Sequence, residues 1–234
     1  MSTSIDVNEK NIGQLFVVST PIGNLADITL RALKTLETVD LILAEDTRHT
    51  AKLLSHFQLK KEMLSYRDQN HSRIIDDIVA RLKNGLNIAI VTDAGTPTIS
   101  DPGFKLVRDV AAKGFGVISI PGASAAIAAL SVSGLPTDKF MFLGFLPKSS
   151  NKRDNILQES LKLDCTVILY ESPYRLRDLI KYLSKKYPGR EMCVVKDITK
   201  LYEKIYRGRS MDIIDLLPNN EKIKGEYTVL IAKE

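Results

Sequence analysis

Residues 88–114 read IAIVTDAGTPTISDPGFKLVRDVAAKG, and this stretch indicates the fold class. It begins with the apolar run Ile88–Thr92, whose β-branched residues are typical of a buried strand. A loop of eleven residues rich in glycine, proline and aspartate follows, Asp93–Gly103. Apolar residues then recur on one face of a helix that ends at Gly114. A strand, a loop and a helix in this order are typical of an α/β fold with a mostly parallel sheet.

Strand and helix patterns alternate along the rest of the chain as well. Further strands are predicted at 15–19, 41–44, 117–120, 139–143, 166–170, 192–195, 204–206 and 227–232. The turn-forming residues Gly134–Asp138 predict a boundary between an N-terminal α/β domain, 1–137, and a C-terminal α/β domain, 138–234. Beyond that boundary the strands lie closer together, and 139–145 and 204–232 have the pattern of antiparallel strands. We therefore expect a mostly parallel sheet in the first domain and a mixed sheet in the second.

The composition excludes several classes of protein. Of the 234 residues, 44% are hydrophobic and 26% are charged, which is typical of a globular protein and not of a disordered chain. No apolar run reaches the roughly 18 residues that span a bilayer, and residues 1–14 lack the apolar core of a signal peptide. Cys165 and Cys193 form no CxxC pair, and the three histidines form no HExxH motif. We therefore expect a cytoplasmic protein with neither disulfides nor a bound metal.

Positive charge is concentrated in one segment. The whole chain has a net charge of +5, but residues 148–209 hold 15 lysines and arginines against 8 aspartates and glutamates, whereas residues 1–147 are neutral overall. Such a segment is typical of a surface that binds a polyanion. A solvated, lysine-rich face explains the same charge equally well, so charge alone does not separate the two interpretations.

Three loops that follow predicted strands have the composition of a ligand-binding site. They are Ser19–Asn24, Asp93–Gly103 and Pro121–Ser124. Ligands of open α/β sheets bind beyond the carboxyl ends of the strands, where glycines let a ligand approach the backbone. The sequence has neither the GxxxxGK[ST] motif of a P-loop nor a GxGxxG motif after its first strand. These absences favour a ligand without clustered phosphates, and an adenosyl cation with an amino-acid tail fits that description.

Two further strings place charged residues directly after predicted strands. In Glu45–Thr50, two carboxylates, an arginine and a histidine follow an apolar strand. Asp46 fits a catalytic residue and a helix cap equally well, whereas Arg48 favours a functional role, because an arginine gains nothing at the start of a helix. Glu171 follows another strand, where a glutamate is either a helix-start acid or a site residue.

Taken together, these strings resemble the ribosomal small-subunit methyltransferase I family. The matching strings are TPIGNL (20–25), DITLRAL (27–33), AEDTRHT (44–50), TDAGTPTISDPG (92–103), IPGASA (120–125), SGLPTD (133–138), GFLPK (144–148), YESPYRL (170–176) and KGEYT (224–228). Ala123 and Tyr202 depart from the family's frequent proline and histidine. The sequence ends soon after KGEYT, where many relatives carry a further extension, so we expect no RNA contact of the kind that the extension would supply.

The resemblance implies both a fold and a function. Members of this family belong to the tetrapyrrole-methylase superfamily, and they methylate the ribose 2′-oxygen of a cytidine in 16S rRNA with S-adenosylmethionine as the methyl donor. The resemblance further implies a two-domain tetrapyrrole-methylase-like fold, a cofactor cleft between the domains and a homodimer. The residues that would bind the cofactor are Pro21, Ile22, Gly23, Asn24, Asp93, Ala94, Gly95, Thr98, Ile99, Ser100, Ser124, Ala125, Tyr170, Glu171, Lys224, Gly225 and Glu226.

The reaction requires a group that activates the ribose hydroxyl, which is otherwise a poor nucleophile. Asp46 is the first candidate for this base or for a residue that orients the acceptor, and Glu171 is the second. Arg48 would hold a phosphate or the nucleotide. The basic residues expected to contact RNA are Arg48, Lys148, Lys152, Arg153, Arg175 and Arg177.

Two alternative functions stay open. One is a methylase of a tetrapyrrole or other small molecule on the same fold, and the basic segment and the AEDTRHT string argue against it. The other is a non-catalytic RNA-binding module, which would have no need of S-adenosylmethionine.

Overall fold

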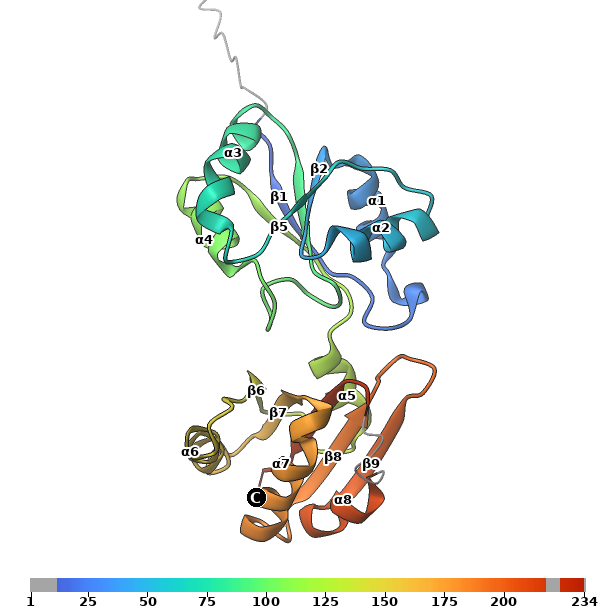
Figure 1. The fold of residues 1–234 in the computed structure, drawn as a ribbon, viewed down its shortest axis with the longest axis vertical. Coiled ribbons are helices and arrows are strands. Elements are labelled where there is room, and N and C mark those ends of the chain that lie inside the picture. The colour runs from blue at the N-terminus through green and yellow to red at the C-terminus, as the bar shows by residue number, and fades with distance from the viewer. Residues whose placement is uncertain (1–11, 218–223, 234) are drawn as a thin grey trace, which may run out of the picture. The chain divides into compact units, whose positions relative to one another are not determined.

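The chain forms two compact units in the computed structural model, which describes residues 12–217 and 224–233 (Figure 1). The N-terminal unit ends at Ala123 and lacks only Ile22–Asn24, a short segment that belongs to the C-terminal unit together with the chain from Ser124 onward. The division therefore lies before helix α5 (Ala125–Ser133), whereas the sequence predicted it after residue 137.

The packing of α5 explains this difference. The helix buries Ala126, Ala129 and Leu130 in one cluster with Ile168 and Leu230 of the C-terminal sheet. The turn-forming residues that follow α5 end a helix rather than a domain, because Gly134 takes the left-handed conformation of a helix C-cap, with φ +78°. Turn signals alone do not distinguish these two cases.

The N-terminal unit is a five-stranded sheet with the order β3-β2-β4-β1-β5. Its strands are β1 (Leu15–Val18), β2 (Leu41–Ala44), β3 (Met63–Ser65), β4 (Ile88–Val91) and β5 (Val117–Ile120). Every neighbouring pair in this sheet is parallel, which confirms the mostly parallel sheet that the sequence predicted. The edge strand β3 was not predicted, because it has only three residues and none of them is fully buried.

Helices cover both faces of this sheet (Figure 1). They are α1 (Leu30–Thr38), α2 (Thr47–His56), α3 (His71–Lys83) and α4 (Phe104–Ala112), and a 3₁₀ turn spans Leu25–Asp27. Along β2, Leu41 and Leu43 pack against α3 and α4, whereas Ile42 packs against α1 and α2. Because successive side chains of a strand point to opposite faces, the central strands are apolar throughout. Each fully buried side chain of this kind contributes about 1.5–3 kcal/mol.

The C-terminal unit is a five-stranded mixed sheet with the order β6-β7-β10-β8-β9. Its strands are β6 (Phe140–Phe145), β7 (Thr166–Glu171), β8 (Glu191–Lys196), β9 (Lys204–Arg209) and β10 (Tyr227–Ile231). The pairs of β10 with β7, β10 with β8 and β8 with β9 are antiparallel, as predicted for 204–232. The antiparallel prediction for 139–145 is wrong, because β6 pairs in parallel with β7. Helix α6 (Ser150–Ser160) forms the crossover between these two strands, and such a crossover makes them parallel.

Two apolar layers hold the C-terminal unit together. One face of the sheet packs against α6, α7 (Pro173–Lys186) and α8 (Ser210–Leu216), and the other face packs against α5. Among residues 12–217 and 224–233, no helix is both long enough and apolar enough to cross a membrane.

Candidate functional site

Within the N-terminal unit, the segments that follow β1, β4 and β5 are hydrogen-bonded to one another. Thr20 and Gly95 exchange two backbone hydrogen bonds, of 2.9 and 3.1 Å, which join the loop after β1 to the loop after β4. The hydroxyl of Thr96 lies 2.9 Å from the Ser19 hydroxyl and donates to the carbonyl of Ala123 at 3.2 Å, which adds the loop after β5. Predicted cofactor residues Pro21 and Asp93–Gly95 therefore lie within one connected edge of the sheet.

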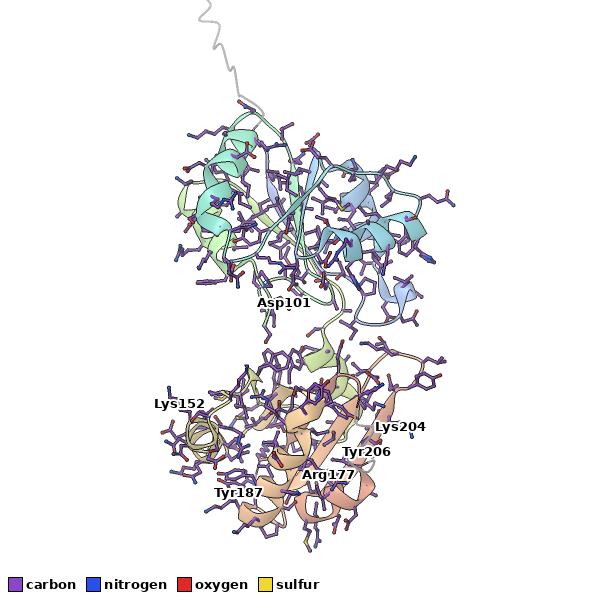
Figure 2. The ribbon with its side chains drawn as sticks, viewed as in Figure 1. Asp101, Lys152, Arg177, Tyr187, Lys204 and Tyr206 are labelled. Atoms are coloured by element: carbon purple, nitrogen blue, oxygen red, sulfur yellow. The ribbon has the colours of Figure 1, made fainter. Side chains whose placement is uncertain are left out.

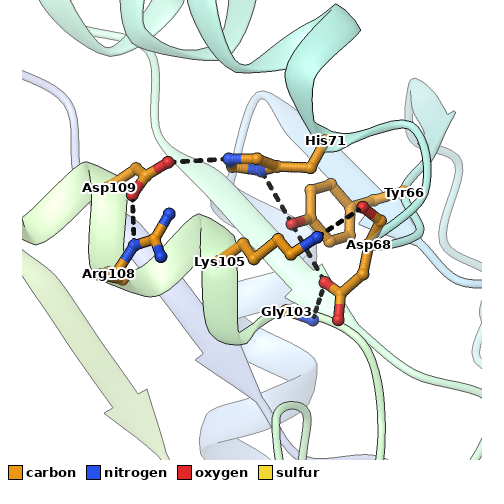
Figure 3. Close-up of polar contacts among 7 residues, drawn as sticks. All are labelled: Tyr66, Asp68, His71, Gly103, Lys105, Arg108 and Asp109. Carbon is orange, nitrogen blue, oxygen red and sulfur yellow. Dashed lines mark hydrogen bonds and ion pairs between the residues drawn. The ribbon is translucent and has the colours of Figure 1, made fainter.

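The loop 93–103 is held in an unusual backbone conformation. Thr98 and Ser100 have φ values of +77° and +64°, which residues with a side chain rarely adopt and which cost about 1–3 kcal/mol each. Gly103 ends the loop with φ +125°, and its N–H donates to Asp68 Oδ1 at 3.2 Å (Figure 3). Strain of this kind is concentrated at ligand-binding sites, so it supports the prediction that Thr98, Ile99 and Ser100 belong to one.

A polar network that the sequence did not reveal anchors the end of this loop (Figure 3). The Tyr66 hydroxyl lies 3.0 Å from His71 Nδ1, and His71 Nε2 lies 2.8 Å from Asp109 Oδ2. The same hydroxyl lies 3.5 Å from Asp68 Oδ1, the acceptor of the Gly103 N–H. Burial raises the pKa of Tyr66, so the hydroxyl keeps its proton at neutral pH. Because its members come from β3–α3 and α4, no local motif reveals this network.

A cavity of about 200 Å³ opens beside these loops in the N-terminal unit. Its walls come from the ends of β1 and β4 and from α2, and the residues that line it are Thr20, Pro21, Leu25, His49, Thr50, Lys52, Leu53, Thr92 and Asp93. Asp93 Oδ1 is buried and has no hydrogen-bond partner among the described residues. A buried acceptor without a partner is costly, so the cavity favours a ligand that brings a hydrogen-bond donor.

Asp46 caps helix α2 and holds Arg48. Its Oδ1 accepts the Arg48 backbone N–H at 2.9 Å, which is the N-cap geometry. The same carboxylate binds the Arg48 guanidinium through Nε at 3.1 Å and Nη2 at 2.6 Å. The hydrogen bond from the guanidinium holds the pKa of Asp46 well below its usual range. Asp46 is therefore a weak base here, whereas the Arg48 side chain, 87% exposed, is presented to solvent in a fixed orientation.

Asp101 is a carboxylate that the sequence pattern did not single out, although it lies inside the string TDAGTPTISDPG. Burial and the neighbouring carboxylate of Glu45 raise the pKa of Asp101 to about 6, and Asp93 adds to the effect. A base works best when its pKa lies near the working pH, so Asp101 is better suited to accept a proton than Asp46.

Residues 12–217 and 224–233 contain no group of three or more histidine, cysteine, aspartate or glutamate side chains arranged to hold a metal ion.

Glu171 ends β7 in the C-terminal unit and is 2% exposed. Its Oε1 accepts the Ser172 N–H at 2.7 Å and pairs with Arg175 Nη2 at 2.7 Å. Burial raises the pKa of Glu171, and the hydrogen bond from Ser172 and the charge of Arg175 oppose that shift. With its carboxylate held between these two groups, Glu171 resembles an anchored helix-start acid more than a free base.

Three further predicted cofactor residues of the C-terminal unit lie where the end of β7 meets the start of α5. They are Tyr170, Ser124 and Ala125. The N–H of Ala126 donates to the Tyr170 hydroxyl at 3.2 Å. Ser124 is the N-cap of α5 but makes no side-chain capping bond, and Ala125 is the first helical residue. The ring of Tyr170 packs edge-on against Phe142 with ring centres 4.9 Å apart. These contacts fix the tyrosine at the end of its strand.

The remaining predicted cofactor residues of this unit lie against the turn between β8 and β9. Gly225 has φ +108°, and a Cβ there would lie 2.5 Å from the Asp197 carboxylate. The N–H of Glu226 donates to Asp197 Oδ1 at 3.0 Å. Lys224 directly precedes Gly225 in the chain. The segment Ile22–Asn24 also lies against this turn, because a Cβ on Gly23 would lie 2.4 Å from Lys200 Cγ.

The basic residues predicted to contact RNA differ in their availability, and Figure 2 labels two of them, Lys152 and Arg177. Lys148, two residues before α6, and Lys152, in its first turn, are exposed. Arg153 pairs with Asp154 at 2.8 Å and lies over the ring of Tyr182, and Arg175 pairs with Glu171. Arg177 is half-buried, and its Nε has no hydrogen-bond partner among the described residues. Among these five residues of the C-terminal unit, the two exposed lysines are thus the most free to bind a phosphate.

Comparison with known proteins gives the chain its family. The family model for tetrapyrrole (corrin/porphyrin) methylases matches residues 14–214. The chain is 47% identical to "Ribosomal RNA small subunit methyltransferase I" of Synechocystis, over 94% of this chain and 79% of that protein. It is 42% identical to the protein of the same name from Thermotoga maritima, over 94% of this chain and 99% of that protein.

A solved structure shows the same fold. It is the uroporphyrin-III C-methyl transferase of Thermus thermophilus complexed with S-adenyl homocysteine, which matches with a TM-score of 0.64 at 16% identity. The match covers 94% of this chain and 97% of that one. With its parallel sheet, its mixed sheet and the strings quoted above, the chain belongs to the tetrapyrrole methylase family and, within it, to the ribosomal RNA small subunit methyltransferase I proteins.

Proposed function

We propose that this protein transfers a methyl group from S-adenosylmethionine to the ribose 2′-hydroxyl of a cytidine in 16S rRNA of the small ribosomal subunit. The observation that carries the proposal is the identity of 42–47% with proteins named ribosomal RNA small subunit methyltransferase I, over 94% of the chain. Because this substrate is ribosomal, we further propose that the protein acts in the cytoplasm.

The residues present fit S-adenosylmethionine. The orphaned carboxylate oxygen of Asp93 would accept a hydrogen bond from the cofactor, and the conformation at Gly95, φ +81°, lets a ligand approach the backbone. Gly122 leaves no room for a side chain, since a Cβ there would lie 2.9 Å from Ser19 Cβ. The cofactor supplies a methyl group that its sulfonium has already activated.

The protein's own residues then act on the acceptor. The Arg48 guanidinium, oriented by Asp46, binds an RNA phosphate near the target nucleotide. Asp101, whose carboxyl lies close enough to Glu45 and Asp93 to feel their charges, takes the proton of the 2′-hydroxyl as the oxygen attacks, and its raised pKa suits it to that role. Alignment of the hydroxyl with the methyl group supplies much of the rate.

The direct test is a map of ribose methylation in rRNA. We expect one cytidine of 16S rRNA to carry a 2′-O-methyl group in cells that have this protein and to lose it when the gene is deleted. Purified protein added to small subunits from the deletion strain should restore the methyl group. An identical map in the two strains would contradict the proposal, and methylation of a porphyrin precursor by the purified protein would favour the small-molecule alternative.

RNA binding should depend on two exposed lysines, Lys148 just before α6 and Lys152 in its first turn. The double variant Lys148→Glu, Lys152→Glu should bind rRNA at least 10-fold more weakly, and the slope of log Kd against log salt should fall by about 1 for each phosphate that the variant no longer binds. Affinity for S-adenosylmethionine should not change, because neither lysine belongs to the predicted cofactor residues.

The control for this experiment is Lys113→Glu, which changes charge by the same amount per site on an exposed position of the N-terminal unit. Equal losses of RNA affinity per charge in the two proteins would show that overall charge, and not the α6 surface, governs binding.

We also expect a homodimer. This prediction rests on the family resemblance, and large apolar side chains such as Phe145 and Leu216 are exposed in the chain described here, at 58% and 50%. Light scattering at micromolar concentration should give twice the mass of one chain. A mass of one chain across that range would rule the dimer out.

A further inference from the structure

Several hydrogen bonds hold the backbone of the turn between β8 and β9. The N–H of Lys200 donates to the Asp197 carbonyl at 2.9 Å, and the N–H of Glu203 donates to the Lys200 carbonyl at 3.0 Å. The N–H of Thr199 donates to Glu203 Oε2 at 2.6 Å. Asp197 and Thr199 both have positive φ, +49° and +66°, although neither is glycine. Two such residues in one turn persist only where the surroundings hold them in place.

This turn lies directly against Ile22–Asn24, which belongs to the same unit. A Cβ built on Gly23 would lie 2.4 Å from Lys200 Cγ and 3.1 Å from Lys200 Cε, so the glycine backbone rests on the aliphatic part of the lysine. The Thr199 hydroxyl lies 2.9 Å from the same point, and it is buried without a hydrogen-bond partner among the described residues. A buried hydroxyl without a partner is costly, so this position beside Gly23 favours a ligand that brings a polar group.

The charged end of Lys200 contacts a second predicted cofactor segment. Lys200 Nζ lies 2.9 Å from Glu226 Oε1. Asp197 fixes the backbone of Glu226 from the same turn, because the Asp197 N–H donates to the Glu226 carbonyl at 2.9 Å and the Glu226 N–H donates to Asp197 Oδ1 at 3.0 Å. One side chain thus supports Gly23 with its carbon chain and holds Glu226 with its ammonium group.

We propose that Lys200 is a positioning residue for S-adenosylmethionine, which sets the Ile22–Asn24 and Lys224–Glu226 segments in their binding geometry. The inference rests on the proposed function, because it takes those two segments to be parts of the cofactor site. A purely structural ion pair is the competing explanation. The Glu226 side chain is 75% exposed and that of Lys200 32% exposed, and pairs of that kind contribute little to stability. The loss of Lys200 should therefore change cofactor affinity much more than folding.

The test separates the two parts of the lysine. Lys200→Ala removes both, and Lys200→Met keeps the carbon chain but loses the charge. Calorimetry with S-adenosylhomocysteine as the probe should give at least a 10-fold weaker Kd for the alanine variant and a smaller loss for methionine. Lys200→Arg, which keeps chain and charge, should recover most of the affinity. In turnover assays the alanine variant should raise KM for S-adenosylmethionine and leave kcat nearly unchanged.

Lys204→Ala is the matched control, since it removes an exposed lysine from the same hairpin. We expect its Kd to equal that of the parent and the Tm values of all four variants to lie within a few degrees of the parent. Parent-like affinity in Lys200→Ala would overturn the inference and leave the proposed function intact. Failure of the parent protein to bind S-adenosylhomocysteine would instead count against the proposed function itself. A loss of affinity that follows Tm across the variants would mean that Lys200 is only structural.

Discussion

Asp101→Asn should slow methyl transfer at least 100-fold at pH 8 without unfolding the protein. Asparagine has nearly the same shape but cannot accept the proton of the ribose hydroxyl, and general-base catalysis is worth on the order of 10²–10⁴-fold. In the parent, the single-turnover rate on small subunits should rise with pH through about 6 and then level off, because the pKa of Asp101 is about 6. The variant should show a low rate without that step.

The same substitution should change stability in a pH-dependent way. Folding raises the pKa of Asp101 above its ordinary value of 3.8, so the folded state binds this proton more tightly than the unfolded state does. The contribution of Asp101 to stability is therefore fully present below pH 4 and is lost as the pH rises through about 6. Asp101→Asn should accordingly be more stable than the parent above pH 6, by about 1 kcal/mol after allowance for partial solvent exposure, and nearly equal below pH 4. Urea unfolding at pH 4 and pH 8 measures both.

Two further variants test whether the loss of rate is specific to Asp101. Asp76→Asn removes an exposed carboxylate from α3 and should leave both the rate and the stability at parent values. Asp46→Asn keeps the helix cap but loses the ion pair with Arg48, so we expect roughly a 10-fold loss, mostly as weaker RNA binding. A fall of 100-fold or more in Asp46→Asn, together with a parent-like rate in Asp101→Asn, would assign the base to Asp46.

Gly95→Val should abolish binding of S-adenosylmethionine, with Kd raised more than 100-fold. Gly95 is buried at the junction of the loops after β1 and β4, where it exchanges two backbone hydrogen bonds with Thr20. A branched side chain at this point takes up the space that a ligand needs to reach the backbone. Because φ is +81° there, valine also adds strain of about 1–3 kcal/mol, so a folding control is essential.

Gly114→Val supplies that control. Gly114 has almost the same φ, +82°, but lies in open space after the end of α4, where a Cβ would meet no atom within 4 Å beyond its chain neighbours. Both variants carry the backbone strain, and only Gly95→Val should lose the cofactor in calorimetry. Equal affinities in the two variants would show that the loop 93–103 does not bind the cofactor.

The fold class and the positions of the loops follow from local pattern. Strands such as 88–91 are apolar throughout because helices cover both faces of a parallel sheet, and this pattern can be recognised in a single segment. The parallel pairing of β6 with β7 was mispredicted. Strands that lie close together in the sequence favour antiparallel pairing, and only the crossover through α6 makes these two strands parallel.

The division between the units and the chemistry of individual site residues depended on contacts between distant segments. Small residues in α5 fit either unit, and only their packing against Ile168 and Leu230 assigns the helix. The chemical character of Asp46 and Asp101 is set by their neighbours, since Arg48 makes the first a weak base and burial beside Glu45 makes the second a stronger one. Lys200 and Gly23 stand far apart in the chain, so no motif couples them. A residue type is a property of the sequence, whereas a pKa or a contact is a property of the environment that the folded chain creates around it.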